Sequence, residues 1–206
     1  MMAQASNVCA ADDIQIINLG PHVFYVPKAW MQGMAVTASL RPKGTVRQPQ
    51  STAIDAAELV FSPREDWQPY GRRELPDFIR IVHAPRERPP PPDAHIKKLI
   101  ADSATLAPDS YGFVRVLPEV VKSDATPAFE TFLYKGFLNK FGEPMVVSSN
   151  NTELSSGYRG PSVVNVTISA DMGIQYDFDN KKFPESTWWD LYQRTQAFVD
   201  YLQTPK

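Results

Sequence analysis

The three histidines are the residues of this sequence best suited to metal binding or proton transfer. They are His22, His83 and His95, and the last two lie on either side of a proline-rich run, with Asp93 close by. A zinc site needs clustered His, Cys or carboxylate ligands at short, characteristic spacings, and these spacings match no such signature. We therefore interpret His83 as a strand residue and His95 as a helix-surface residue, and we predict no bound metal.

Other residue patterns that support catalysis are absent or incomplete. The sequence contains no glycine-rich phosphate-binding motif, and Ser155-Ser156-Gly157 lacks the first glycine of a nucleophile elbow. The single cysteine, Cys9, lies in a polar N-terminal stretch without a fixed basic partner to activate its thiol. Asp177 and Asp179 lie on one face of an expected strand, where two solvated carboxylates are ordinary surface residues. These patterns predict a protein that is not an enzyme and binds no cofactor.

Composition limits the classes of partner. The 206-residue chain has a formal net charge of −2 and a pI near 5.9, whereas nucleic-acid-binding proteins present a basic surface to the phosphates. We predict no nucleic-acid partner. No stretch approaches the roughly 18 consecutive apolar residues of a membrane-spanning helix, so we also predict no transmembrane segment.

The N-terminus carries little structural signal. Residues 1–12 are small and polar without periodicity, and we expect a disordered lead. No apolar core of an export signal follows Met1, which fits either an exported protein whose signal has been removed or a cytoplasmic protein.

Short apolar stretches bounded by Gly and Pro predict strands in both halves of the chain. We expect strands over residues 13–18, 22–26, 34–40, 78–83, 111–117, 129–136 and 143–148. A helical turn is expected over 30–34 and a short helix over 94–101. The stretch 54–61 is consistent with either a helix or a strand.

The last fifty residues have the clearest pattern. Residues 163–169 and 174–178 alternate apolar and polar side chains around a turn at 170–173, which predicts a hairpin with one buried and one solvated side. A helix is expected next, with start signals at Pro184 and Ser186 and Pro205 just past its end. The residues expected to cover the apolar side of the sheet recur at helical spacing and are Trp188, Leu191, Tyr192, Thr195, Phe198, Val199 and Leu202.

These elements predict an α+β fold, a mostly antiparallel sheet covered by the C-terminal helix. The sharpest change in composition is at residues 85–92, which end in four consecutive prolines. Such a run favours a stiff, extended connector, with a ligand for a proline-reading module as the alternative. We expect a single domain over residues 13–206, or two lobes, 13–84 and 94–206, joined by this linker.

Two polar segments are candidate binding surfaces. Residues 148–160 form a long connection between expected strands, and loops of that length are often functional. Tyr, Trp and Arg are favoured at protein interfaces. The predicted partner-binding residues are Asn150, Asn151, Glu153, Tyr158 and Arg159 in this segment, and Trp67, Tyr70, Arg72 and Arg73 in a second one.

Three segments resemble one class of bacterial proteins. They are the strand that runs into Pro27-Lys28-Ala29-Trp30, the strand at residues 142–148, and the closing hairpin followed by Trp188-Trp189-Asp190-Leu191. Together they resemble periplasmic immunity proteins of interbacterial toxin systems, notably those paired with type VI secretion lipase effectors. The resemblance implies a periplasmic, non-catalytic protein that binds one cognate toxin and blocks it.

Three hypotheses follow for function. The first is an immunity or inhibitor protein that occludes a cognate toxin. The second is a binding or assembly subunit of a bacterial envelope or secretion machine, which docks through strand edges or the proline run. The third is an enzyme whose acid–base residues come together from distant segments.

Overall fold

The computed structural model describes residues 13–38, 53–67, 69–70, 74–83, 94–116, 129–150, 161–169 and 171–205. Its α-helices are α1 (Ala94–Ser103) and α2 (Trp188–Gln203), and 3-10 helices occur at Lys28–Gly33 (η2) and Glu185–Thr187 (η3). The strands are β1 (Ile14–Leu19), β2 (His22–Pro27), β3 (Met34–Ala38), β4 (Ile54–Phe61), β5 (Phe78–His83), β6 (Phe113–Val116), β7 (Phe129–Leu138), β8 (Pro144–Asn150), β9 (Ser162–Ser169) and β10 (Met172–Phe178).

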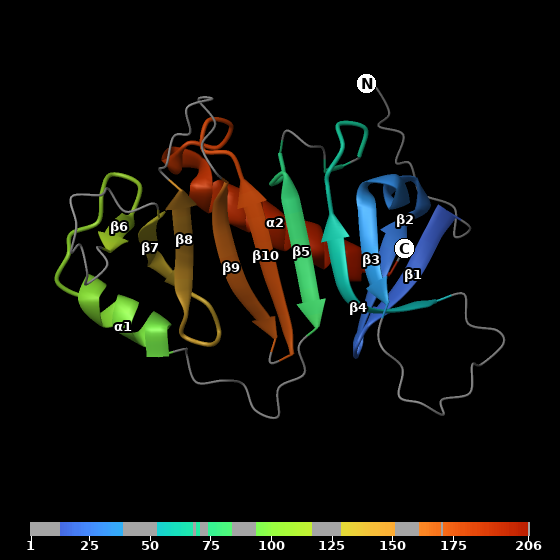
Figure 1. Cartoon of the computed structure of the whole chain (residues 1–206), viewed down its shortest axis with the longest axis horizontal. Coiled ribbons are helices and arrows are strands. Elements are labelled where there is room, and N and C mark those ends of the chain that lie inside the picture. The colour runs from blue at the N-terminus through green and yellow to red at the C-terminus, as the bar shows by residue number, and fades with distance from the viewer. Residues whose placement is uncertain are drawn as a thin grey trace, which may run out of the picture.

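All ten strands of the described residues belong to one open sheet (Figure 1). Its order is β2-β1-β4-β5-β10-β9-β8-β7-β6, and β3 pairs with residues 56–61 of β4. The neighbouring pairs are antiparallel except β1 and β4, which run parallel over three residues. The predicted α+β class and the mostly antiparallel sheet are confirmed.

Helix α2 covers one face of this sheet and crosses it diagonally (Figure 1). Trp188, Leu191, Phe198 and Leu202 are each at most 3% exposed and belong to one continuous core with the apolar face of the sheet. The prediction that the closing helix covers the sheet is therefore confirmed. Burial of an aromatic or aliphatic side chain on this scale contributes about 1.5–3 kcal/mol per residue.

The other face of the sheet is covered only at one end in the described parts of the chain. There α1 places Leu99 against Val116 of β6 and Leu133 of β7, in a second and smaller apolar cluster. From β4 to β8 no described helix lies in front of the strands (Figure 1).

The strands on either side of residues 84–93 belong to the same sheet. β5 pairs along its whole length with β10, from Phe78 opposite Asp177 to His83 opposite Met172. Two lobes are not confirmed, because the uninterrupted pairing of β5 with β10 joins the two segments in one sheet. The proline-rich run itself and the predicted lead at residues 1–12 lie outside the described residues.

Several boundaries differ from the sequence-based expectations. The ambiguous stretch 54–61 is the strand β4, because β3 and β5 both pair with it. β6 begins two residues later than expected, at Phe113, since the Asp109 carboxylate accepts the backbone N–H groups of Tyr111 and Phe113 and holds a turn there. β7 extends to Leu138 through a bulge between Leu133 and Leu138.

Neither α1 nor α2, nor any other helix in the described ranges, combines the length and apolar character needed to cross a membrane.

The fold generates a first prediction on stability. Phe198 of α2 is fully buried between Trp30, Phe61 and Tyr70, so Phe198→Ala should lower the free energy of unfolding by about 3–5 kcal/mol. Urea denaturation of the purified variant measures this. Phe78→Ala is the matched control, because Phe78 is 46% exposed on the uncovered face, and it should cost about 1 kcal/mol or less. Equal losses in the two variants would contradict the central place of α2.

Candidate functional site

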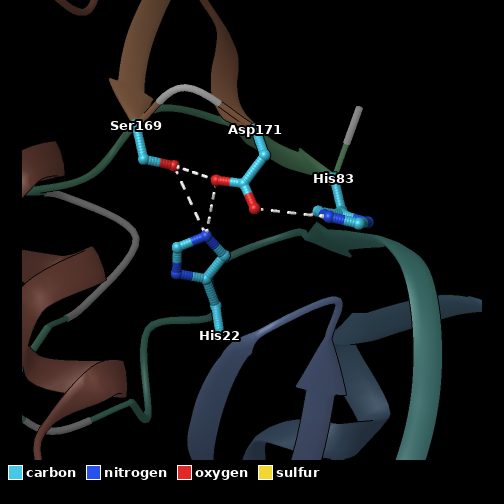
Figure 2. Close-up of polar contacts among 4 residues, drawn as sticks. All are labelled: His22, His83, Ser169 and Asp171. Carbon is cyan, nitrogen blue, oxygen red and sulfur yellow. Dashed lines mark hydrogen bonds and ion pairs between the residues drawn. The ribbon is translucent and has the colours of Figure 1, made fainter. Parts of the chain in front are cut away.

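Four polar side chains meet beside the ends of several strands, on one side of the sheet along the strand direction (Figure 2). His22 is the first residue of β2, His83 is the last residue of β5, and Ser169 is the last residue of β9. Asp171 follows Ser169 in the turn between β9 and β10. We refer to these four residues as the imidazole–carboxylate cluster.

Strand register and one glycine bring the cluster together. In the sheet, Met172 lies opposite both His83 and Ser169, so the residue before it, Asp171, lies beside both. Gly20, in the turn before His22, has a φ of +61° and packs directly on the His83 ring. A Cβ atom there would lie 2.3 Å from His83 Nε2. The absence of a side chain at Gly20 therefore allows the β1–β2 turn to reach the cluster.

The carboxylate of Asp171 is the centre of this arrangement. Its Oδ1 atom accepts a hydrogen bond from Ser169 Oγ at 2.6 Å and lies 3.0 Å from His22 Nε2. Its Oδ2 atom lies 3.4 Å from His83 Nε2. The side chains of His22, His83 and Asp171 are 22%, 19% and 25% exposed, so water reaches the cluster only partly.

These contacts favour the ionised form of the acid. The hydrogen bond from Ser169, followed by that from His22, lowers the pKa of Asp171 to about 2. Each donor stabilises the carboxylate and would lose its acceptor if that oxygen became protonated.

The arrangement is suited to joining chain segments rather than to activating a nucleophile. Ser169 Oγ also lies 3.4 Å from His22 Nε2, but the same nitrogen faces the Asp171 carboxylate more closely and must carry a proton to do so. A general base has to offer an unprotonated nitrogen to the serine hydroxyl. Ser169 instead donates to Asp171, so the cluster cross-links β2, β5 and the β9–β10 turn.

Metal binding is not favoured by the described residues. No group of three or more of their His, Cys, Asp and Glu side chains is arranged to hold a metal ion. The sequence placed His83 near His95 and Asp93, but the structure pairs His83 with Asp171. The side chains of His95 and Asp93 lie outside the described set.

The sequence contained little signal for this cluster. His22 and Asp171 are 149 positions apart, and Ser169 and Asp171 read only as the end of a strand and part of a turn. Gly20 next to Pro21 indicated a turn before His22, but nothing in the sequence indicated what that turn would touch.

The predicted binding residue Trp67 lies in the core. It is 1% exposed and stacks on Trp30 with ring centroids 4.8 Å apart. Because a buried ring cannot contact a partner without leaving the core, Trp67 is a packing residue rather than a surface contact. The large apolar ring of Trp67 is stabilised by burial, and Trp30 and Phe61 provide the aromatic surfaces on which it packs.

Tyr70 remains half-buried at the surface of the same aromatic cluster. Its ring packs on Phe198 and Tyr201, and its hydroxyl donates to the carbonyl of Ala197 at 3.1 Å. Burial, and then the nearby carboxylates of Asp200 and Glu74, raise the pKa of Tyr70. The structure thus places Tyr70 beside the C-terminal half of α2. Arg72 and Arg73 lie outside the described residues.

Of the predicted binding segment at residues 148–160, the structure describes only residues 148–150. Asn150 is the last residue of β8 and pairs with Phe129, while Asn151, Glu153, Tyr158 and Arg159 lie outside the described residues. Close to the end of β8 and the start of β9, a small hydrogen-bond network joins these strands and the turn after β10. Asn180 donates to Ser149 Oγ at 2.8 Å, and Ser162 Oγ donates to Asn180 Oδ1 at 2.7 Å.

That network is buried. Ser149 is 2% exposed and Ser162 is fully buried. Buried hydroxyl and amide groups that satisfy one another fix the relative positions of the strands that carry them. The ends of β8 and β9 next to the predicted binding segment are therefore held at a defined separation.

Comparison with known proteins gives no family assignment. No known protein family matches the sequence, and no curated protein matches it. Among solved structures, the iron-regulated outer membrane lipoprotein FrpD of Neisseria meningitidis is similar over 93% of each chain, with 12% sequence identity and a TM-score of 0.49. The resemblance to immunity proteins stays a prediction.

The lowered pKa of Asp171 has a consequence for acid stability. A carboxyl group whose pKa in the folded state, about 2, lies below its ordinary 3.8 stabilises the fold above the ordinary value. This contribution is lost as the pH falls from about 4 towards about 2. Asp171→Ala should lower the free energy of unfolding by about 1–3 kcal/mol at pH 6, and the deficit should shrink as the pH approaches 3.

Denaturant titrations between pH 3 and pH 6 measure this deficit. Glu65→Ala is the control, since Glu65 is an exposed loop residue, and its effect should be small at every pH. A deficit for Asp171→Ala that does not change with pH would show that Asp171 acts by packing and not by charge.

The energetic effect of the close contact between Gly20 and His83 can be measured separately from that of the positive φ angle of Gly20. Gly20 and Gly142 both have positive φ angles, +61° and +76°, but nothing lies within 4 Å of a Cβ built on Gly142. Gly142→Ala should therefore cost only the left-handed backbone penalty of about 1–2 kcal/mol. Gly20→Ala should cost measurably more, because its methyl group displaces the His83 ring. Equal changes in melting temperature for the two variants would mean that the His83 ring moves freely.

Proposed function

We propose that this protein is a non-catalytic immunity or inhibitor protein that binds a protein toxin and blocks it by occlusion. The class of partner rests on the sequence resemblance described above. The observation that supports a binding role is the face of the central sheet that no described helix covers between β4 and β8 (Figure 1).

Two rows of side chains cross the middle of this face. In one row, Phe78 of β5 lies opposite Asp177 of β10, which lies opposite Val163 of β9. In the other row, Arg80, Gln175 and Asn165 follow one another across the same strands. Residues directly opposite each other in neighbouring strands lie on the same face of the sheet. We call the surface formed by these two rows the open face; its residues are Phe78, Arg80, Val163, Asn165, Gln175 and Asp177.

The open face has the composition of a protein-binding surface. Phe78 is 46% exposed, Arg80 and Asn165 are exposed, and Val163, Gln175 and Asp177 are half-buried. Interfaces of proteins that associate and dissociate mix apolar and polar area in this way, and aromatic and Arg side chains are enriched in them. Small molecules favour concave pockets, whereas a sheet face offers a broad surface.

The side chains of the open face are also held in place. Arg80 forms an ion pair with Glu58 of the neighbouring strand β4, with Arg80 Nη2 3.2 Å from Glu58 Oε2. The Gln175 amide donates to Asp177 at 3.4 Å. Preordered side chains lose less conformational entropy on binding, which favours tight association. A rigid surface of this kind suits an inhibitor that must stay bound over an active site.

The test uses the protein encoded beside the gene for this chain as the candidate toxin. We expect co-expression to restore growth of cells that express the toxin, and we expect the two purified proteins to form a stable complex. Val163→Arg and Asn165→Arg, on the β9 side of the open face, should weaken binding at least tenfold, which is about 1.4 kcal/mol. The melting temperature should stay unchanged.

Two sets of variants locate the contact. Glu65→Arg introduces the same side chain on an exposed loop and should leave binding unchanged. Tyr158→Ala and Arg159→Ala test the segment predicted from the sequence, and a loss of more than about 1 kcal/mol would include it in the interface. The proposal fails if the wild-type protein neither protects cells nor forms a complex.

A further inference from the structure

An exposed aromatic ring and a carboxylate lie side by side on the open face. Phe78 of β5 lies directly opposite Asp177 of β10, and residues paired in this way have Cβ atoms about 5 Å apart on the same side of a sheet. Phe78 is 46% exposed, and Asp177 is half-buried. We call these two residues the Phe78–Asp177 pair. A protein that covers the open face must contact both of them.

The charge of Asp177 is not neutralised by an ion pair within the described ranges. Its Oδ1 atom accepts a long hydrogen bond, 3.4 Å, from the uncharged amide of Gln175. The cation nearest in the sheet register is Arg80, but its Nε and Nη2 atoms donate to the two carboxylate oxygens of Glu58. Hydrogen bonding to Glu58 and the charge of Glu58 raise the pKa of Arg80 more than the charge of Asp177 does. Because Glu58 compensates Arg80, one negative charge, that of Asp177, is left over on the open face.

The ring of Phe78 has no cation above it in the part of the chain that the structure describes. The cation–π contacts found there join Lys140 to Phe141 and Lys182 to Phe183. Lys182 also forms an ion pair with the residue next to Phe78, Asp77, at 2.7 Å. The nearby cations are therefore engaged elsewhere, and the Phe78–Asp177 pair can accept a cation from another molecule.

The pair restricts the chemistry of a partner that covers it. Binding of a protein removes water from Asp177, and a carboxylate that loses its water without gaining a partner is strongly destabilised. A stable complex thus needs a cation opposite Asp177. Arginine fits the pair best, because its planar guanidinium can stack on an aromatic ring while its N–H groups bind a carboxylate. The lysine ammonium is a compact and more strongly hydrated charge, which suits this arrangement less well.

We propose that the Phe78–Asp177 pair is a recognition site for an arginine side chain of the partner protein, whose guanidinium stacks on the Phe78 ring and pairs with the Asp177 carboxylate. This inference rests on the proposed function, because it names the chemistry that the partner presents to the open face. Val163 lies opposite Asp177 on the other side, where it can pack against the aliphatic part of the same arginine.

A titration with a small molecule tests the site on this protein alone. N-acetyl-arginine amide should shift the nuclear magnetic resonance signals of the Phe78 ring and the Asp177 carboxyl group before those of other residues, and binding should weaken as salt is added. N-acetyl-citrulline amide has nearly the same shape without the charge, so it should shift both signals several-fold less. Asp177→Asn keeps an acceptor for the Gln175 amide and should remove the preference for the arginine compound. The site is overturned if the two compounds act equally, or if the largest shifts lie elsewhere.

The complex with the candidate toxin provides the second test. Asp177→Asn and Phe78→Leu should each weaken binding about tenfold and leave the melting temperature unchanged. Glu65→Gln controls for the loss of one negative charge on an exposed loop and should bind like the wild-type protein.

The outcomes separate this inference from the proposed function. Undiminished binding by Asp177→Asn and Phe78→Leu would overturn the arginine site and leave the proposed function standing. Failure of the wild-type protein to form any complex would overturn the proposed function. The titration with N-acetyl-arginine amide needs no toxin, so it decides the arginine site in that case too.

Discussion

The structure depends on the burial of one aromatic seam between α2 and the sheet. At one end of the seam, Trp188 packs against Phe113, Phe132 and Phe178, and its indole Nε1 donates to the carbonyl of Phe183 at 3.0 Å. At the other end, Phe198 packs against Trp30, Phe61 and Tyr70. Because these rings come from both halves of the chain, the helix can be buried only when the whole sheet has formed. Packing between α2 and the sheet therefore makes one structural unit of segments that are distant in the sequence.

A single large helix leaves the two faces of the sheet in different environments. The face beneath α2 is apolar and closely packed. The opposite face, which includes the open face, mixes apolar and polar side chains, and among the described helices only α1 covers it, at the β6–β7 end. Antiparallel sheets tolerate this asymmetry, because alternate residues of each strand point to opposite sides. The surface proposed for binding is thus a direct consequence of how the core is built.

Two carboxyl groups with large pKa shifts, Asp171 and Glu185, lie in the β9–β10 turn and at the start of η3 rather than on the open face. Hydrogen bonds from Ser169 of β9 and His22 of β2 lower the pKa of Asp171 to about 2. Burial, followed by the nearby Asp109, raises the pKa of Glu185 to about 7. The contact between His22 and Asp171 links the β9–β10 turn to the distant strand β2, so the ionisation of Asp171 and the position of that turn depend on each other. The two pKa shifts have opposite signs, because hydrogen-bond donors favour the charged form of Asp171 while burial disfavours the charged form of Glu185.

The sequence by itself determined the local elements with strong periodicity. The hairpin of β9 and β10, the strand β5 and the helix α2 follow from alternation at period two or at helical spacing, and these patterns depend on residues close together in the chain. The α+β class and the burial of Trp188 and Phe198 followed from the same local signals. The sequence also indicated the polar side of the hairpin, with Asn165, Gln175 and Asp177.

Only the tertiary structure decided which distant segments meet. Pairing of β5 with β10 joined into one sheet the segments for which a single domain or two lobes had both been predicted, and it placed Arg80 beside Gln175 on the open face. Packing against Trp30 and Phe61 buried Trp67, which composition alone had suggested as a surface residue. The tertiary structure also brought His22 to Asp171. These outcomes depend on which faces can be buried together and at what register. The strand pairing and register with the lowest free energy depend on all strands of the sheet together, so they cannot be predicted from any short stretch of sequence.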